Sequence, residues 1–345
     1  MIISKTPFRV SFFGGGTDYP EYFTRYGGAV LGTAIDKSTY LAATPFYSRL
    51  FDYSIRLAYR KVECVKDLEF IEHAPFRECL RWTGVTGNIE LDCMAELPSC
   101  VGLGTSSAFV VGVLNTLHAF QGRAVHPLEL AYQAIEIERD VLHESVGCQD
   151  QTFAAMGGFN LVEFRGVRDI VVHRVPLTPE RQREFEAHLM LVYTGIRRRA
   201  AEIAARLVER IDQNRARLKR MRQMVDEGYT TLVGRGSLEG FGRLLHESWV
   251  LKHQLDGAVS NDRINDIYRR GLEAGALGGK LLGAGGGGFV AFFVPPERRA
   301  AVRKALADLE EIPVQVNAPG TQIIHAALPS RSTAPPAADA PRWAA

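Results

Sequence analysis

Three glycine-rich segments each stand beside an apolar stretch of the chain. They are GGGTD at Gly14–Asp18, PSCVGLGTSSA at residues 98–108 and GAGGGG at residues 283–288. Glycine lets backbone N–H groups approach a ligand closely, although a tight turn explains one such segment equally well. Three of them in one chain favour a bound ligand.

The second segment has the features of an anion site. It runs into an apolar helix expected over Ser106–Phe120, whose positive end and free N–H groups point at the same place as the amides of residues 102–105. The Ser106 hydroxyl either caps that helix or binds a Mg²⁺ ion that accompanies phosphates. These features favour phosphate binding over a plain cap.

Two known phosphate motifs do not fit. The P-loop needs Gly-Lys followed by Ser or Thr, and Gly279-Lys280 is followed by Leu281. GAGGGG satisfies GxGxxG but precedes a strand instead of opening a helix, which is the wrong context for a dinucleotide site.

Carboxylates follow the first long helix. Glu136, Glu138 and Asp140 end the amphipathic segment expected as a helix over Leu128–Glu144, and at least two of them should face solvent. Asp150 lies between two glutamines in a glycine-flanked loop. It either caps a short helix over Gln151–Met156 or acts as a general base for a hydroxyl nucleophile.

Composition limits the classes of protein. The 345 residues carry 41 basic and 39 acidic side chains, a net charge of +2, so no global field favours nucleic acid, and the basic stretch 206–223 has interspersed acids typical of a solvated helix. Five cysteines without a CxxC pair argue against a disulfide framework or zinc site. With no signal-peptide pattern and no membrane-length apolar run, we expect a cytoplasmic protein.

Strands and helices alternate with short connections, which predicts an α+β fold. We expect strands over 2–13, 29–45, 88–92, 188–194, 288–294, 312–316 and 322–328, a hairpin over 159–175, and helices over 200–226, 238–251, 263–273 and 296–309. Pro176, Pro179 and a charged run predict a boundary near 176–187. The expected divisions are an N-terminal lobe 1–180, a C-terminal lobe 181–328 and a disordered tail 329–345.

Taken together, these segments resemble the GHMP kinase superfamily of galactokinase, homoserine, mevalonate and phosphomevalonate kinases. TPFRVSFFGGGTDYP is similar to its motif one, PSCVGLGTSSA to its motif two and KLLGAGGGGFV to its motif three. The resemblance implies a two-lobed fold with a ribosomal-protein-S5-like N-terminal lobe and a ferredoxin-like C-terminal lobe, ATP as cofactor, and Mg²⁺. IERD, GCQDQTFAAMGGFN, LVYTGIRRRA and GALGGKLLGAGGGGF are similar to bacterial heptose 7-phosphate kinases of GDP-heptose synthesis, and related sugar kinases share some of them.

The resemblance also implies roles for individual residues. ATP phosphates would be held by Gly102, Leu103, Gly104, Thr105, Ser106 and Ser107, and Mg²⁺ by Ser106 and Glu138. Asp150 would be the base, with Arg9 beside it; Gly15, Gly16 and Asp18 would bind the sugar. Gly283, Gly285, Gly286 and Gly287 would let motif three pack against motif two and the substrate. From charge alone, Arg197, Arg198, Arg199 or Lys252 are candidates for a phosphate already on the sugar, and the arginine run is equally consistent with a solvated helix start.

These roles predict in-line transfer of the ATP γ-phosphoryl group to a sugar hydroxyl. For heptose 7-phosphate the acceptor is the anomeric hydroxyl and the product is the 1,7-bisphosphate. The alternatives are a kinase for unphosphorylated fucose or galactose and a non-catalytic sugar and nucleotide sensor on the same scaffold. We expect a small-molecule partner and neither nucleic acid nor membrane, and a homodimer is left open.

Overall fold

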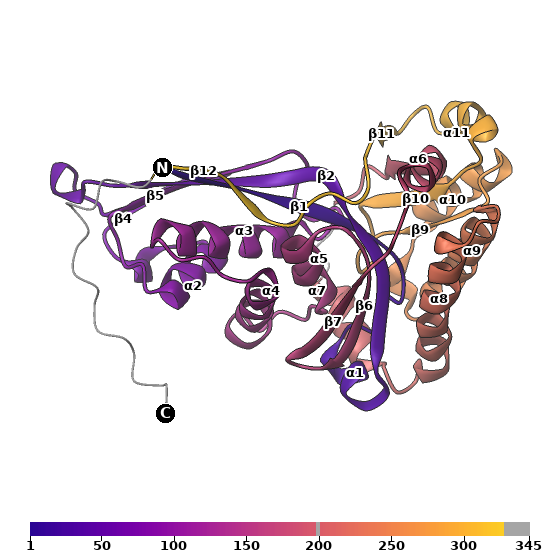
Figure 1. The fold of residues 1–345 in the computed structure, drawn as a ribbon, viewed down its shortest axis with the longest axis horizontal. Coiled ribbons are helices and arrows are strands. Elements are labelled where there is room, and N and C mark those ends of the chain that lie inside the picture. The colour runs from indigo at the N-terminus through magenta and orange to yellow at the C-terminus, as the bar shows by residue number, and fades with distance from the viewer. Residues whose placement is uncertain (198–200, 328–345) are drawn as a thin grey trace.

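Two β-sheets organise the chain in the computed structural model, which describes residues 1–197 and 201–327 (Figure 1). The larger sheet has the order β12-β1-β2-β5-β3-β4, and the hairpin β6–β7 joins it through β2. Its strands are β1 (Ile2–Phe13), β2 (Gly28–Pro45), β3 (Ile55–Ala58), β4 (Val62–Val65), β5 (Ile89–Ala95), β6 (Phe159–Gly166), β7 (Asp169–Arg174) and β12 (Gln322–Ala326). All pairs are antiparallel except β3 with β5.

Helices of the first half cover one face of this sheet (Figure 1). They are α2 (Ala74–Thr83), α3 (Thr105–Phe120), α4 (Pro127–Glu136) and α5 (Gln149–Met156), while α1 (Pro20–Tyr26) connects β1 to β2. The buried apolar residues Val110, Val113 and Leu117 of α3 belong to the same core as Phe8 and Val10 of β1. This packing brings the start of α3 to the middle of β1.

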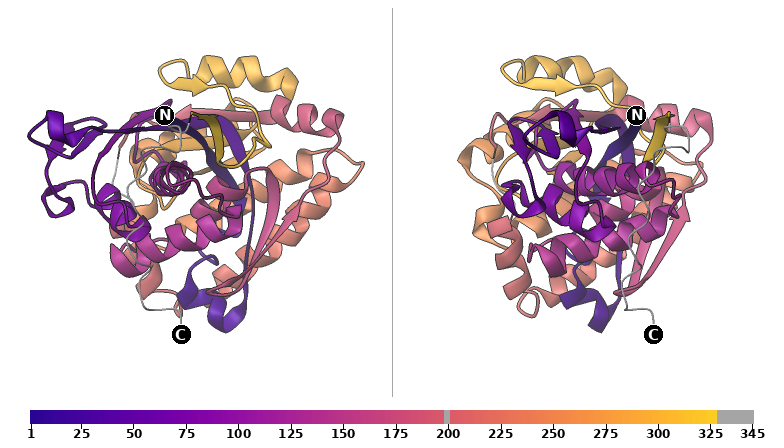
Figure 2. Two further views of the ribbon diagram at one scale, coloured as in Figure 1. Left: turned by 60° about the vertical axis from the view of Figure 1, so that its left-hand side comes forward. Right: turned by 90° about the vertical axis from the view of Figure 1, so that its left-hand side faces the viewer.

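The smaller sheet has the order β11-β8-β10-β9 and is antiparallel throughout. Its strands are β8 (Leu189–Tyr193), β9 (Gly278–Leu281), β10 (Phe289–Phe293) and β11 (Glu310–Ile312), with helices α6 (Pro179–His188), α7 (Ala201–Glu209), α8 (Arg215–Val233), α9 (Glu239–His253), α10 (Asp262–Glu273) and α11 (Arg299–Ala305). Helices α9 and α10 pack on β9. Helices α8, α9, α10 and α11 lie together beyond one end of the larger sheet, whereas α7 lies beside α5 and β6 in that view (Figure 1). The two further views place α11, in yellow, at one edge of the molecule (Figure 2).

A cluster of phenylalanines joins the two halves. Phe12 at the end of β1 lies 5.3 Å from Phe185 of α6 and 5.4 Å from Phe241 of α9 between ring centroids, and Phe293 of β10 contacts both of those rings. All four side chains are fully buried. The junction between the sheets is therefore a packed core, which holds the loops at its edge in fixed relative positions.

The α+β class is confirmed, and several local expectations are corrected. The expected helix 200–226 is divided into α7 and α8, and α4 ends at Glu136 before a π-helical turn, Ile137–Val141. Residues 176–187 hold the capped helix α6, with Thr178 as its N-cap and Pro179 in its first turn. Sequence periodicity also missed α2, β3 and β4.

The last strand differs most from expectation. Strand β12, assigned from sequence to the C-terminal lobe, pairs with β1 at the edge of the larger sheet. The tail 329–345 lies outside the described residues, so its expected disorder stays a prediction. The expected lobe limits also stay predictions. Among the described residues, no helix is long and apolar enough to cross a membrane.

Candidate active site

Arg9 and Asp150 form the polar centre of the region where the glycine-rich segments meet. The Arg9 guanidinium donates from Nε to Asp150 Oδ1 at 2.7 Å and from Nη2 to Oδ2 at 2.6 Å. Its third nitrogen donates to the Gly102 carbonyl oxygen at 2.7 Å. A two-point pair of this kind orients a carboxylate in a fixed plane.

An irregularity in β1 makes this arrangement possible. The pairing of β1 with β2 shifts register between Pro7 and Arg9, and the Arg9 N–H donates instead to the Leu103 carbonyl oxygen at 3.0 Å. A Cβ at Gly104 would lie 3.2 Å from the Arg9 side chain and 3.3 Å from Asp150 Oδ2. The backbone of motif two therefore lies directly against the Arg9–Asp150 pair.

The N-terminus of α3 is left without a side-chain cap. Gly104 is the N-cap residue, with a left-handed φ of +71°, and no side chain accepts a hydrogen bond from the first turn. Ser106 is exposed on that turn and Ser107 is buried. Free N–H groups and the positive end of a sixteen-residue helix fit an anionic group such as the phosphates of ATP.

Glu138 lies next to this helix in the π-helical turn. Its carboxylate accepts hydrogen bonds from the Ser107 hydroxyl at 2.9 and 3.1 Å and from the Gln151 amide nitrogen. It is 1% exposed, and burial, with smaller contributions from Glu144 and Asp150, raises its pKa to about 8. Among the described residues it has no cationic partner within ion-pair distance.

One of the two adjacent serines of α3 contacts Glu138, while the expected binding of Mg²⁺ by Ser106 stays a prediction. The hydroxyl beside Glu138 belongs to Ser107, not to Ser106, because the buried side of α3 faces the π-helical turn. The described residues contain no group of three or more His, Cys, Asp or Glu side chains that could hold a metal ion. A single buried carboxylate beside the uncapped N-terminus of α3 still fits Mg²⁺, which is commonly bound by one or two protein ligands together with phosphates.

Asp18 is a second buried carboxylate, at the end of the motif-one loop. Its Oδ1 accepts from the Gly16 N–H at 3.0 Å and its Oδ2 from the Gln149 N–H at 3.4 Å, one residue before Asp150. Burial, followed by the charge of Asp150, raises its pKa to about 6. A Cβ at Gly147 would lie 2.0 Å from Asp18 Oδ2, so the close approach requires glycine there.

Motif three lies against motif two. A Cβ on Gly102 would lie 2.6 Å from the Leu282 carbonyl oxygen, and a Cβ on Gly283 would lie 2.6 Å from the Gly102 Cα. The Gly286 N–H donates to the Val259 carbonyl oxygen at 2.9 Å, and Gly285 has a φ of +126°. Only residues without side chains allow these backbones to approach so closely.

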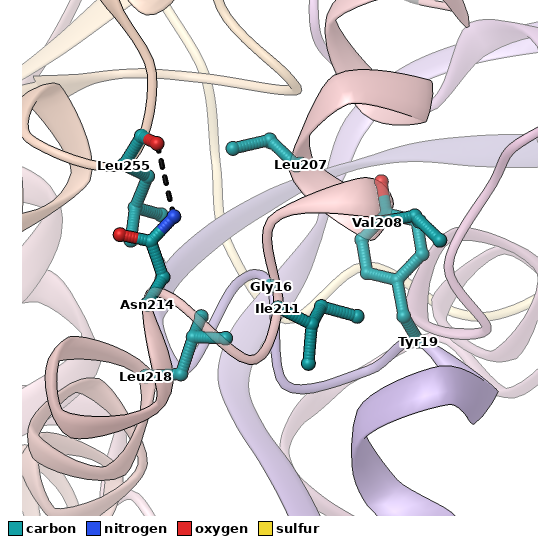
Figure 3. A pocket seen from close by; sticks show the side chains of 8 residues that line it. All are labelled: Gly16, Tyr19, Leu207, Val208, Ile211, Asn214, Leu218 and Leu255. Atoms are coloured by element: carbon teal, nitrogen blue, oxygen red, sulfur yellow. Dashed lines mark hydrogen bonds between the residues drawn. The ribbon is translucent and has the colours of Figure 1, made fainter.

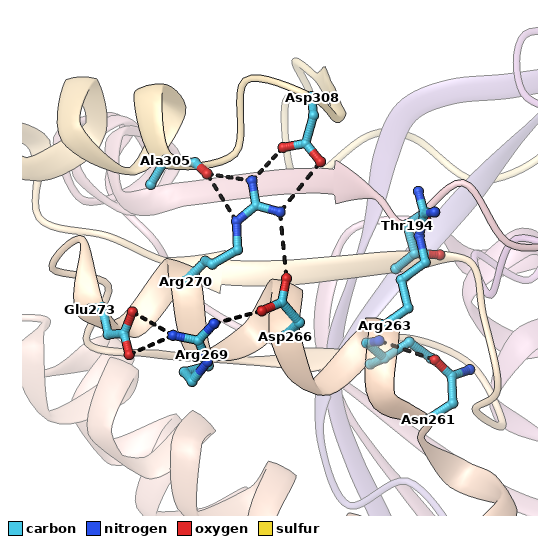
Figure 4. Close-up of polar contacts among 10 residues, drawn as sticks. Thr194, Asn261, Arg263, Asp266, Arg269, Arg270, Glu273, Ala305 and Asp308 are labelled. Carbon is cyan, nitrogen blue, oxygen red and sulfur yellow. Dashed lines mark hydrogen bonds and ion pairs between the residues drawn. The ribbon is translucent and has the colours of Figure 1, made fainter.

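Arginines of helix α10 contact the residue after β8 and the segment that follows α11 (Figure 4). Arg263 Nε donates to the Thr194 carbonyl oxygen at 3.0 Å, and Asn261 Oδ1 caps the helix by accepting from the Ile264 N–H at 3.1 Å. Farther along, Arg270 pairs with Asp308 and Arg269 with Glu273. Of these contacts, the one from Arg263 anchors the end of β8 that precedes Arg197.

The residues expected to bind a sugar phosphate differ in their exposure to solvent and in whether the structure describes them. Lys252 is corrected: its side chain is buried and its ammonium donates to the carbonyl oxygens of Leu281, at 2.8 Å, and Gly283, so it does not face an open site. Arg197 is exposed. Arg198 and Arg199 lie outside the described residues.

A small apolar recess lies beside motif one (Figure 3). Tyr19 lines it together with α7 and the segment that follows, and Asn214 holds one wall by donating to the Leu255 carbonyl oxygen at 3.0 Å. The remaining lining residues are Gly16, Leu207, Val208, Ile211, Leu218 and Leu255. Sequence reasoning missed this wall, as it missed Ser107 beside Glu138, Gln151 and Lys280.

Family comparison agrees with this geometry. The family models described as GHMP kinases N terminal domain and GHMP kinases C terminal match residues 65–158 and 230–311. The D-glycero-alpha-D-manno-heptose 7-phosphate kinase of Campylobacter jejuni is 30% identical over 317 residues, 88% of this chain and 93% of that protein. L-fucokinase/L-fucose-1-P guanylyltransferase of Bacteroides fragilis is 26% identical over 88% of this chain, which spans 35% of that protein.

Solved structures share the fold. A D-glycero-D-manno-heptose 1-phosphate kinase from Bacteroides thetaiotaomicron superposes with a TM-score of 0.78 at 24% identity, covering 94% of this chain and all of that one. A putative sugar kinase from Campylobacter jejuni gives a TM-score of 0.67 at 26% identity, covering 93% of this chain and 97% of that one. The chain therefore belongs to the GHMP kinase family.

Proposed function

We propose that this kinase transfers the γ-phosphoryl group of ATP to the anomeric hydroxyl of D-glycero-D-manno-heptose 7-phosphate, giving the 1,7-bisphosphate for GDP-heptose synthesis in the cytoplasm. The broader statement is that it is an ATP-dependent sugar kinase of the GHMP family. The observation that carries the proposal is the Arg9–Asp150 pair, which joins the motif-two backbone to the first turn of α5, where the Gln149 N–H contacts Asp18. The similarity to the heptose 7-phosphate kinase supports the choice of sugar.

Each half of the site has its own task. The amides of Gly102, Gly104 and the first turn of α3 hold phosphate oxygens, and Asp150 orients the acceptor hydroxyl and accepts its proton. Arg9 keeps the carboxylate in place and offers positive charge to the transferred group. Asp18, with the Gly15 and Gly16 backbone, binds sugar hydroxyls, and Gly285 and Gly286 complete the acceptor side.

The residues around Glu138 fit a metal ion bound with ATP. Glu138 and Ser107 would hold Mg²⁺, with Ser106 on the exposed side of the same turn. Bound there, Mg²⁺ would neutralise charge on the phosphates. The protein contributes the Glu138 carboxyl group, already held by two donors.

A kinase for an unphosphorylated sugar is the second candidate, and one observation favours it. Lys252 is committed to two backbone carbonyls, which leaves Arg197 as the described candidate for a sugar phosphate. The relatives named fucokinase and galactokinase show that the same family includes such enzymes.

A panel of acceptors tests the choice. D-glycero-D-manno-heptose 7-phosphate, the free heptose, L-fucose and galactose are compared in an ATP-consumption assay, with NMR of the product to locate the new phosphate. We expect kcat/KM for the heptose 7-phosphate to exceed that for the free heptose by at least about a hundredfold, since a phosphate held by charge-assisted hydrogen bonds contributes several kcal/mol. Arg197→Glu and Arg198→Glu should each be made; one of them should raise KM for the phosphorylated sugar only. Equal rates on heptose and its phosphate would instead support the second candidate.

A further inference from the structure

Two lysines are buried directly behind the glycine-rich segments. Lys280 is 3% exposed and Lys252 is 7% exposed, and among the described residues neither forms an ion pair with a carboxylate. Burying an ammonium group without an anionic partner is costly, and lysine is rarely fully buried. Burial lowers the pKa of Lys280 to about 7 and that of Lys252 well below its usual range.

Both ammonium groups hold backbone carbonyls at the site. Lys280 Nζ, on β9, donates to the Phe12 carbonyl oxygen at 2.9 Å, across 268 residues of sequence. Lys252 Nζ, on α9, donates to Leu281 and Gly283, which flank the start of motif three. With Arg9 donating to Gly102, one buried cation holds a carbonyl in or beside each glycine-rich segment.

Two buried phenylalanines end β1 before the motif-one loop. Phe13 pairs with Leu31 of β2 and lies 4.9 Å from Phe241 between ring centroids. The ring of Phe12, one residue earlier, is held in the aromatic cluster between the two halves, and Gly14 and Gly16 follow Phe13 with φ of +83° and +96°. Lys280 fixes the backbone of Phe12 while the cluster fixes its ring. The direction in which the loop leaves β1, and therefore the place of Asp18, depends on both.

Charge acts in the same direction as geometry. The negative charge of Asp18 favours the charged form of Lys280, while burial and Arg9 oppose it. The same carboxylate also interacts with the groups that surround it from the neighbouring elements: Asp150, Lys252, Lys280, Tyr19 and Cys148. In this set of described residues the two lysines are the cations without a carboxylate partner. Arg9, which faces both lysines, is paired with Asp150, and Arg139, which faces Tyr19 and Cys148, is paired with Glu21.

We propose that Lys280 is a positioning residue for the acceptor: its ammonium holds the Phe12 carbonyl, fixes the motif-one loop and supplies positive charge that favours ionised Asp18. The proposal rests on the proposed function only in assigning Asp18 to the acceptor sugar. It goes beyond that function because it gives a role to a buried side chain whose ammonium contacts the Phe12 backbone.

Lys280→Met tests this by removing charge and hydrogen bond while keeping most of the volume. KM for the acceptor should rise about tenfold with KM for ATP unchanged within about twofold, because Lys280 holds motif one and not motif two. The acid limb of kcat/KM for the acceptor should move up by about half to one pH unit, since Asp18 loses a nearby cation. The acceptor is whichever sugar the wild-type protein phosphorylates best, so failure of the heptose assignment leaves this test intact.

Arg181→Met is the matched control. Arg181 also clamps carbonyls, donating to Leu232 at 3.0 Å and Thr231 at 2.8 Å, but neither belongs to a glycine-rich segment. The Arg181→Met variant should lower the melting temperature and leave unchanged the KM for the acceptor, the KM for ATP and the acid limb of kcat/KM. Lys280→Gln, which is also neutral, is the second variant and should show the same shift of the limb.

Three results would overturn the proposal. One is a lower melting temperature for Lys280→Met with unchanged acceptor KM and acid limb. Another is an equal rise in both KM values, which would mean general loosening of the site. The third is failure of both Lys280 variants to fold while Arg181→Met folds, which would make the role structural.

Discussion

Asp150 and Glu138 are carboxylates of one site in opposite surroundings. Asp150 is a quarter exposed and held on both oxygens by the Arg9 guanidinium. Glu138 is fully buried, is held by the neutral donors Ser107 and Gln151, and has no cation beside it among the described residues. Environment divides work between two chemically similar groups in this way in other active sites.

The difference shows what each carboxylate is suited to receive. Asp150 already has its positive partner, so it is ready to orient a neutral hydroxyl. Glu138 is a buried carboxyl group without a cationic partner among the described residues, and burial raises its pKa to about 8. A cation that binds with ATP would neutralise the Glu138 carboxylate, whereas a proton neutralises it when no cation is bound.

The largest expected effect comes from Asp150→Asn. The amide keeps the shape of the side chain but cannot take a proton, so kcat should fall about a thousandfold, in the range found for loss of a general base. Affinity for a non-hydrolysable ATP analogue, measured by calorimetry, should stay within about threefold, because the proposed function assigns the phosphates to motif two.

Asp140→Asn is the control for that variant. Asp140 is exposed, in the same π-helical turn as Glu138, and forms no hydrogen bond among the described side chains. Its kcat should equal that of the wild-type protein. If Asp150→Asn kept a tenth or more of the wild-type kcat, Asp150 would orient the hydroxyl without accepting its proton.

Sequence identified the three glycine-rich segments because glycine signals are local, and the family resemblance implied that motif three packs against motif two. Gly102 and Gly283 could be named without a structure, since a glycine run beside an apolar element has few explanations. Arg9 came with the resemblance, but its bidentate contact depends on the register shift in β1, which no periodicity encodes.

The hydrogen bonds between buried side chains could not be predicted from the sequence. Ser106 and Ser107 are adjacent, and only the packing of α3 decides that Ser107 faces Glu138. The π-helical turn adds to this, because its wider turn changes which face of the chain Glu138 occupies. Lys280 stands in the motif three that sequence recognised, yet its contact with Phe12 joins strands of two different sheets.

The second prediction sharpens the comparison at Glu138. Ser107→Ala should raise the Mg²⁺ concentration needed for half-maximal activity about tenfold, because it removes a donor that orients the carboxylate. Ser106→Ala, its neighbour on the exposed side of the turn, should raise that concentration less than about threefold. Magnesium titrations at saturating ATP measure both. A larger effect of Ser106→Ala than of Ser107→Ala would instead make Ser106 the serine that binds Mg²⁺, as the family resemblance implies.

The smallest expected effect is on the stability of the metal-free protein. Folded Glu138 keeps its proton up to about pH 8, while in the unfolded chain it ionises near pH 4.5, so between these values the folded state binds more protons and its stability falls as pH rises. Glu138→Gln removes this loss. In EDTA, its melting temperature should exceed that of the wild-type protein by about 5 °C at pH 8 and differ little at pH 5.

Gln151 makes that substitution easy to accommodate. Its Oε1 is buried without a hydrogen-bond partner, so rotation of the amide allows it to accept from the new side chain. Glu136→Gln is the control. Glu136 lies two residues before Glu138 and pairs with Arg168 at the surface, so this variant should show no increase in melting temperature that grows with pH. A Glu138→Gln difference that is the same at both pH values would mean that Glu138 is ionised in the metal-free fold, and its contrast with Asp150 would then lie in hydrogen bonding alone.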